Sequence, residues 1–145
     1  MDVLKMQVSS LLENRKRIHE EFKKAPFEPS LVDVNGVEEQ FIENVIEEIE
    51  RNLDNASFTT NQLAKNIGMS RTTFYNKTKA ITGLKPTEFV RNYRLKIAAQ
   101  YLEKGFSAKE SMHRTGFNTA GYFTQSFKTL YKMTPSEYTS RFKNV

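Results

Sequence analysis

The chain contains no cysteine and only two histidines. Without thiols it can form neither a disulfide framework nor a thiolate zinc site. His19 and His113 lie in different segments, and no Ser/His/Asp set, metal-ligand spacing or glycine-rich phosphate loop accompanies them. These absences argue against an enzyme, so we expect no catalytic residues, no metal, no cofactor and no small-molecule ligand.

Long apolar runs are also missing. No stretch approaches the ~20 apolar residues that span a bilayer, and no signal peptide opens the chain. We therefore expect no membrane contact in this chain. The lack of cysteine fits a reducing cytoplasm.

Acidic residues are scarce after residue 50. Residues 1–50 hold 6 Lys or Arg against 12 Asp or Glu, a net charge of −6, whereas residues 51–145 hold 16 against 5, a net charge of +11. A basic region beside an acidic one suggests a polyanion as the partner of the second part. A basic surface that only keeps the protein soluble is the alternative reading of the charge.

Three segments follow one another along the chain. Residues 1–24 form an expected amphipathic helix, because apolar side chains recur at helical spacing from Leu4 to Phe22. Two prolines and a glycine then mark residues 25–37 as a linker. A compact domain is expected over residues 38–145, where 38% hydrophobic content overall is enough for a core.

Only helical periodicity fits the compact domain. The spacing of apolar residues, capping residues and glycines predicts an all-α fold of about seven helices: two helix-turn-helix units joined by a long central helix. We place the first unit at about residues 60–80, the linker helix at about 86–103 and the second unit at about 107–131. Thr134 and Pro135 open the last helix.

The two units are an internal repeat. At an offset of 48, Gly68 matches Gly116, and after one inserted residue the offset becomes 49. The pairs matched at this second offset are Phe74 and Phe123, Lys79 and Lys128, Pro86 and Pro135, Glu88 and Glu137, and Phe89 and Tyr138. Tandem similarity of this kind indicates one supersecondary unit used twice, and a short helix, a glycine turn and a second polar helix make a helix-turn-helix.

A central helix between two such units can set the distance between their second helices. A central helix of about 16 residues is roughly 24 Å long. With the side chains at its ends, it can hold two recognition helices near the ~34 Å spacing of successive major grooves on one face of DNA. A monomer would then read two groove segments. A purely structural helix-turn-helix remains the alternative.

From these residues the chain resembles the DNA-binding domain of the AraC/XylS family of bacterial transcription regulators over about residues 38–143. The matching positions in the second unit are Gly116, Phe117, Asn118, Tyr122, Phe123, Ser126, Phe127, Lys128, Tyr131, Thr134, Pro135, Ser136, Glu137 and Tyr138. Those in the first unit are Leu63, Ala64, Gly68, Met69, Ser70, Arg71, Lys77, Lys79, Thr82, Gly83, Arg94 and Leu95. The resemblance implies double-stranded promoter DNA as the partner.

The resemblance also implies which side chains face DNA. The expected base-contacting residues are Thr72, Tyr75, Asn76, Gly121, Tyr122 and Gln125. The expected phosphate-contacting residues are Arg71, Thr73, Lys77, Lys79, Asn118, Thr119 and Lys128. The apolar faces of the same helices carry Phe74, Phe117, Phe123 and Phe127, which are expected in the core.

The second unit departs from the family pattern. A large aliphatic residue, an alanine and a valine usually precede the second glycine, and Ser111, Met112 and Thr115 stand there instead. Met112 should push the two helices apart or force them to repack, at ~1–3 kcal/mol. Gly121 costs about 1 kcal/mol relative to alanine within a helix and offers no side chain to a base. We therefore expect the second unit to be softer and less base-specific.

The segment before the domain resembles the junction that follows a receiver domain in one-chain hybrid two-component regulators. On that interpretation residues 1–24 hold the last helix of a response-regulator receiver, and the chain is the output domain of a larger signalling protein. RNA polymerase and a second copy, bound through the region before the domain, are further expected partners. The alternative is a protein-interaction or dimerisation module that acts through the amphipathic helix.

Overall fold

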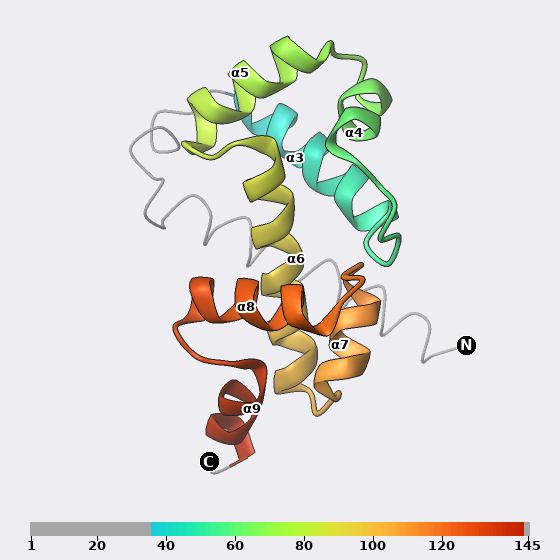
Figure 1. Ribbon diagram of the computed structural model, residues 1–145. Helices are drawn as coiled ribbons and strands as arrows, with labels where there is room; N and C mark the ends of the chain where they lie inside the picture. The colour runs from blue at the N-terminus through green and yellow to red at the C-terminus, as the bar shows by residue number, and fades with distance from the viewer. Residues whose placement is uncertain (1–35, 144–145) are drawn as a thin grey trace, which may run out of the picture.

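Figure 1 shows the computed structural model, which describes residues 36–143. That range contains seven helices and no strand, so the predicted all-α class is confirmed. The helices are α3 (Gly36–Arg51), α4 (Thr60–Asn66), α5 (Arg71–Thr82), α6 (Pro86–Glu103), α7 (Ala108–Arg114), α8 (Ala120–Tyr131) and α9 (Pro135–Lys143). None of them is long and apolar enough to cross a membrane.

The expected N-terminal helix over residues 1–24 lies outside the described residues, as does most of the expected linker. Because α3 begins at Gly36, the last two residues that the sequence assigned to the linker are helical. The central helix has 18 residues, slightly more than the 16 expected from the sequence.

Capping side chains set where the helices begin. Thr59 and Gln62 form a capping box at the start of α4. The Thr59 hydroxyl accepts the Gln62 N–H at 3.2 Å, and the Gln62 amide oxygen accepts the Thr59 N–H at 2.9 Å. Ser70 caps α5, and its hydroxyl oxygen accepts the Thr73 N–H. Thr119 caps α8. Each cap satisfies a backbone donor that the first helical turn leaves without a partner.

The helices that follow each unit begin alike. Thr134 and Pro135 open α9 as predicted, and Thr134 forms a capping box with Glu137. The hydrogen bond from the Thr134 N–H also lowers the pKa of Glu137. In α6, 49 residues earlier, the Glu88 carboxylate accepts the Lys85 N–H at 3.0 Å, and Pro86 opens the helix. The repeat seen in the sequence is therefore a repeat of local structure.

Helix α6 belongs to two apolar cores. The first core packs α3, α4 and α5 against Phe89, Tyr93 and Ile97 of α6, and the second packs α7, α8 and α9 against Leu95 and Leu102. At 100° per residue these two sets lie on nearly opposite faces of α6. The four phenylalanines that the sequence assigned to the interior, Phe74, Phe117, Phe123 and Phe127, are all buried.

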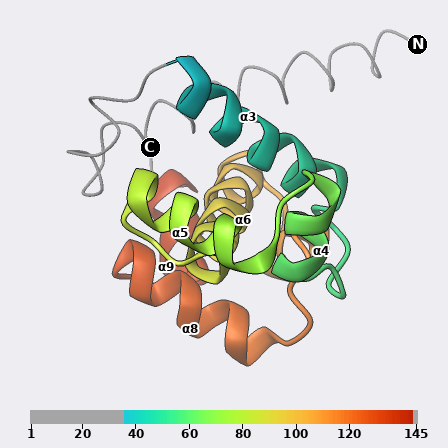
Figure 2. The same cartoon turned by 90° about the horizontal axis from the view of Figure 1, so that it is seen from above.

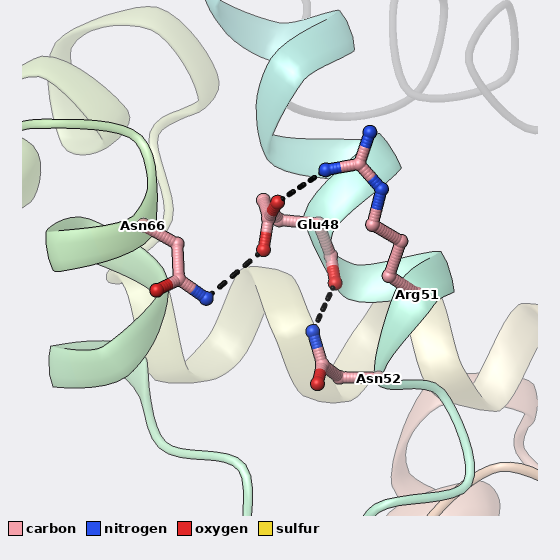
Figure 3. A network of polar contacts seen from close by, with 4 residues as sticks. All are labelled: Glu48, Arg51, Asn52 and Asn66. Carbon is pink, nitrogen blue, oxygen red and sulfur yellow. Dashed lines mark hydrogen bonds and ion pairs between the residues drawn. The ribbon is translucent and has the colours of Figure 1, made fainter.

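A polar network joins α3 to the first helix-turn-helix. The Glu48 carboxylate accepts a hydrogen bond from the Asn66 side chain of α4 at 3.1 Å and pairs with Arg51 at 2.7 Å, and the Glu48 carbonyl accepts the Asn52 side chain at 2.9 Å (Figure 3). Arg51 is exposed, so its ion pair with Glu48 adds little to stability. The network mainly orients α4 against α3.

The unusual residues of the second unit, Ser111, Met112 and Thr115, are all buried. Met112 is 6% exposed within the second core, and α7 and α8 stay in contact. The expectation that Met112 changes how the two helices pack stays a prediction. The buried Thr115 hydroxyl donates to the Ser111 carbonyl at 2.7 Å, whereas the buried Ser111 hydroxyl has no hydrogen-bond partner among the described residues.

Ser111→Ala should therefore stabilise the domain. Removing a buried hydroxyl that has no partner raises the free energy of unfolding by about 1 kcal/mol. Thr115→Val is the matched control, because it removes a buried hydroxyl that does have a partner, and it should lower the free energy of unfolding by about 1 kcal/mol. Chemical denaturation monitored by circular dichroism measures both. A loss of stability in Ser111→Ala would contradict the assignment of an unsatisfied group.

The second unit should open more readily than the first. Helix α8 contains Gly121 and buries two side chains, whereas α5 has no glycine and buries four. We expect the backbone amides of α8 to exchange with deuterated water faster than those of α5 under native conditions. Hydrogen exchange followed by NMR measures both helices in one sample, and equal protection would remove this expectation.

Candidate nucleic-acid interface

The second helices of the two units, α5 and α8, lie toward opposite ends of α6 (Figure 1). Figures 1 and 2 agree that α5 and α8 run in the same direction along the molecule. Each follows a seven-residue helix, α4 or α7, through a turn that contains a glycine with positive φ. The repeat therefore presents two equivalent helices in the same sense.

The outer face of α5 carries the predicted residues. Thr72, Tyr75, Asn76 and Lys79 are all exposed, and at 100° per residue they share the face opposite the buried Phe74. Tyr75 is 40% exposed, so this ring lies at the surface. The face combines hydroxyl, phenol, amide and ammonium groups, which are the groups that read base edges and phosphates.

Arg71, Thr73 and Lys77 flank this face. Arg71 and Thr73 are exposed in the first turn of α5. Lys77 is half-buried, and its ammonium lies 5.0 Å from the centre of the Phe41 ring of α3, a cation–π contact. The structure therefore places Lys77 at the α3 side of the helix, away from the face that holds Asn76.

The outer face of α8 carries one side chain fewer than that of α5, because Gly121 stands where α5 has Thr72. Gly121, Gln125 and Lys128 are exposed along one stripe, and a side chain added at Gly121 would meet nothing within 4 Å. Tyr122 is 54% exposed and leans on the buried Phe117, with the ring centres 5.9 Å apart. Lacking a side chain at Gly121, this helix offers its backbone for close approach.

Asn118 and Thr119 lie just before α8, and both are exposed. The Thr119 hydroxyl oxygen accepts the Tyr122 N–H at 3.3 Å as the helix cap. Asn118 lines a cleft between the two units. Both residues therefore stand at the N-terminal end of α8, where the helix dipole favours an anion.

A cleft connects the two units. It is lined by Ala56, Phe58, Thr59, Thr60, Thr87, Val90, Arg91, Arg94, Gly116, Phe117, Asn118 and Tyr122. Thr60 and Thr87 also line an adjoining hollow with Arg71 and Tyr75 of α5. The N-terminal ends of α5 and α8 therefore border one continuous surface.

Sequence reasoning missed two parts of this surface. Thr124 is exposed on α8 at the position that matches Tyr75 of α5 at the offset of 49, so the repeat itself held the signal. Thr87 and Arg91 of α6 line the cleft, and nothing in the sequence distinguished them from other polar residues of a long helix. Within residues 36–143, no three His, Cys, Asp or Glu side chains are grouped to hold a metal ion.

Comparisons with known proteins agree with this geometry. A family model described as a helix-turn-helix domain matches residues 63–141. A histidine kinase, P4, from Formosa agariphila is 33% identical over 140 residues, which is 95% of this chain and 10% of that protein. A putative AraC-like transcription regulator from Streptomyces lividans is 30% identical over 83 residues, which is 57% of this chain and 27% of that protein.

A solved structure resembles the fold as well. A DNA-binding transcriptional dual regulator from Escherichia coli K-12 superimposes with a TM-score of 0.63 at 25% identity, over 70% of this chain and 91% of that one. The chain spans only about a tenth and about a quarter of the two curated relatives. With the family match over more than half of its length, the chain belongs to the AraC-type helix-turn-helix family of DNA-binding domains.

Proposed function

We propose that the domain binds promoter DNA with α5 and α8 in successive major-groove segments on one face of the duplex. The observation that carries the proposal is the continuous surface between the N-terminal ends of the two helices. Helix α6 has 18 residues and is about 27 Å long, which suits two helices held one turn of DNA apart.

Base recognition then rests on the outer faces of the two helices. Asn76 and Gln125, which match at the offset of 49, each offer an amide that can bond the edge of adenine at two points. Thr72 and Tyr75 complete the first set, and Tyr122 the second. Gly121 brings the backbone of α8 close to the groove, so α8 supplies fewer base contacts than α5.

Phosphate contacts supply affinity without sequence information. Arg71, Thr73 and Lys79 serve this role around α5, and Asn118, Thr119 and Lys128 around α8. Lys77 takes part only where the DNA backbone passes the α3 side of α5, because its ammonium lies against Phe41.

The domain is proposed to be the output module of a two-component signalling protein. The similarity to the Formosa agariphila histidine kinase covers 95% of this chain but 10% of that protein, which leaves room for sensor, kinase and receiver segments in a longer parent. Phosphorylation of a receiver would pair two domains on adjacent sites and so raise their local concentration. The bound domain, in the cytoplasm at the nucleoid, would then contact RNA polymerase or exclude it, even if the parent is membrane-anchored.

Asn76→Ala and Lys79→Ala should separate base reading from phosphate binding. Asn76→Ala should relax the preference at one base pair and cost about 1–3 kcal/mol at the best site, whereas Lys79→Ala should weaken binding to all sequences alike. Selection from a random duplex pool, followed by affinity measurements on the selected and scrambled sites, tests both. The same uniform loss in the two variants would contradict the assignment of Asn76.

Salt dependence should identify Lys128 as a phosphate contact. Lys128→Ala should make the slope of log affinity against log salt less steep by about 1. Arg51→Ala is the charge-matched control, since Arg51 belongs to α3, which lies across α6 from α8 in Figure 2. Equal slopes for wild type and Lys128→Ala would contradict the proposed contact. The alternative, binding of a protein partner through the amphipathic helix expected at residues 1–24, would be apolar and would not weaken as salt rises.

A further inference from the structure

Arg94 is a buried charge between the two helix-turn-helix units. It lies near the middle of α6 and is 6% exposed. Thr87, Arg91 and Arg94 fall at helical spacing on one stripe of α6, between the face that packs on the first core and the face that packs on the second. Arg94 therefore forms the floor of the cleft that joins the units.

The guanidinium of Arg94 divides its hydrogen bonds between the units. Its Nη1 donates to the carbonyl oxygens of Thr115 at 3.2 Å and Gly116 at 2.9 Å, in the turn before α8. Its Nη2 donates to the carbonyl oxygens of Asn52 and Asn55, both at 3.2 Å, in the loop after α3. The planar fork thus holds one loop of each unit at a fixed separation.

The electrostatics of this position favour a cation. The four carbonyl groups follow the C-terminal ends of α3 and α7, where helix dipoles carry partial negative charge. Burial lowers the pKa of Arg94 and the charge of Asp54 opposes that effect, and an arginine in a protein remains protonated. The acceptors compensate a charge that the core cannot solvate, so their positions are coupled to that of the guanidinium.

The turn glycines of the two units show that this contact is close. Gly68 and Gly116 have φ of 76° and 78°, but a Cβ at Gly68 would meet nothing within 4 Å. A Cβ at Gly116 would lie 1.8 Å from Nη1 of Arg94 and 2.6 Å from the Leu53 carbonyl oxygen. Gly116 is therefore needed for the approach of the two units, in addition to the conformation of its own turn.

We propose that Arg94 is a positioning residue that fixes the relative orientation of the two helix-turn-helix units and so determines which spacing of DNA half-sites one molecule accepts. The inference rests on the proposed function. Each unit packs on its own face of α6, and the two apolar cores share no residue. The hydrogen bonds of the Arg94 guanidinium connect a loop of the first unit directly to a loop of the second.

The orientation can be measured without DNA. The chain has no cysteine, so Ala80→Cys on α5 and Thr129→Cys on α8 place two spin labels at exposed sites outside the proposed contacts. Double electron–electron resonance should give a narrow distance distribution in the wild-type background. Arg94→Lys keeps the charge but loses the fork, and Gly116→Ala displaces it, so both should broaden or shift the distribution. Gly68→Ala, which strains an equivalent turn in open space, should leave it unchanged.

The consequence for DNA is tested on duplexes that carry the selected half-sites with one base pair inserted or deleted between them. Wild type and Gly68→Ala should prefer one spacing by on the order of tenfold, and Arg94→Lys and Gly116→Ala should lose most of that preference. Circular dichroism and thermal melting identify which variants are folded at the assay temperature. If Arg94→Lys does not fold, the spacing preference and label distances of Gly116→Ala test the proposal.

Two results would overturn the inference. One is an unchanged label distance in the folded variants, and the other is an unchanged spacing preference. A wild-type protein that binds none of the duplexes specifically overturns the proposed function and the spacing claim together, whereas the label distances still decide whether Arg94 fixes the units.

Discussion

Every feature of the binding surface depends on one helix that is buried on two sides. In α6, Phe89, Tyr93 and Ile97 complete the core of the first unit, while Leu95 and Leu102, on nearly the opposite face, complete that of the second. Because each short unit lacks enough apolar surface to form a core alone, both depend on this shared helix. The length and straightness of α6 therefore determine the distance and the relative orientation of α5 and α8.

The two copies of the unit have different strengths. In the first, α5 buries four side chains and displays an amide, hydroxyls and a phenol, so it suits discrimination between bases. Both units bury two hydroxyl-bearing side chains, Thr78 and Thr82 in the first and Ser111 and Thr115 in the second, and in the second Gly121 leaves the outer face of α8 without a side chain at that position. On the proposed function, a monomer would contact a long DNA site, and most of the base contacts would come from α5.

The repeat also explains which residues sequence reasoning reached. Matching Phe74 with Phe123 and Pro86 with Pro135 located both units, their buried faces and the helix starts, because helical periodicity and capping are local properties of the chain. At the offset of 49, the same repeat also indicates Thr124, which matches Tyr75. Lys77 was assigned by resemblance alone, and its contact with Phe41 of α3 depends on a helix 36 residues earlier in the chain.

The sequence by itself determined the helices, their caps, the duplicated unit and the basic character of its surface, since these follow from residue types at short spacing. Only the tertiary structure decided how the units face each other. The carbonyl groups that hold Arg94 are backbone atoms of Asn52, Asn55, Thr115 and Gly116, and a backbone carbonyl looks the same in every residue of a sequence. Their convergence on one guanidinium, 42 residues from one partner and 22 from another, exists only once both cores have packed on α6.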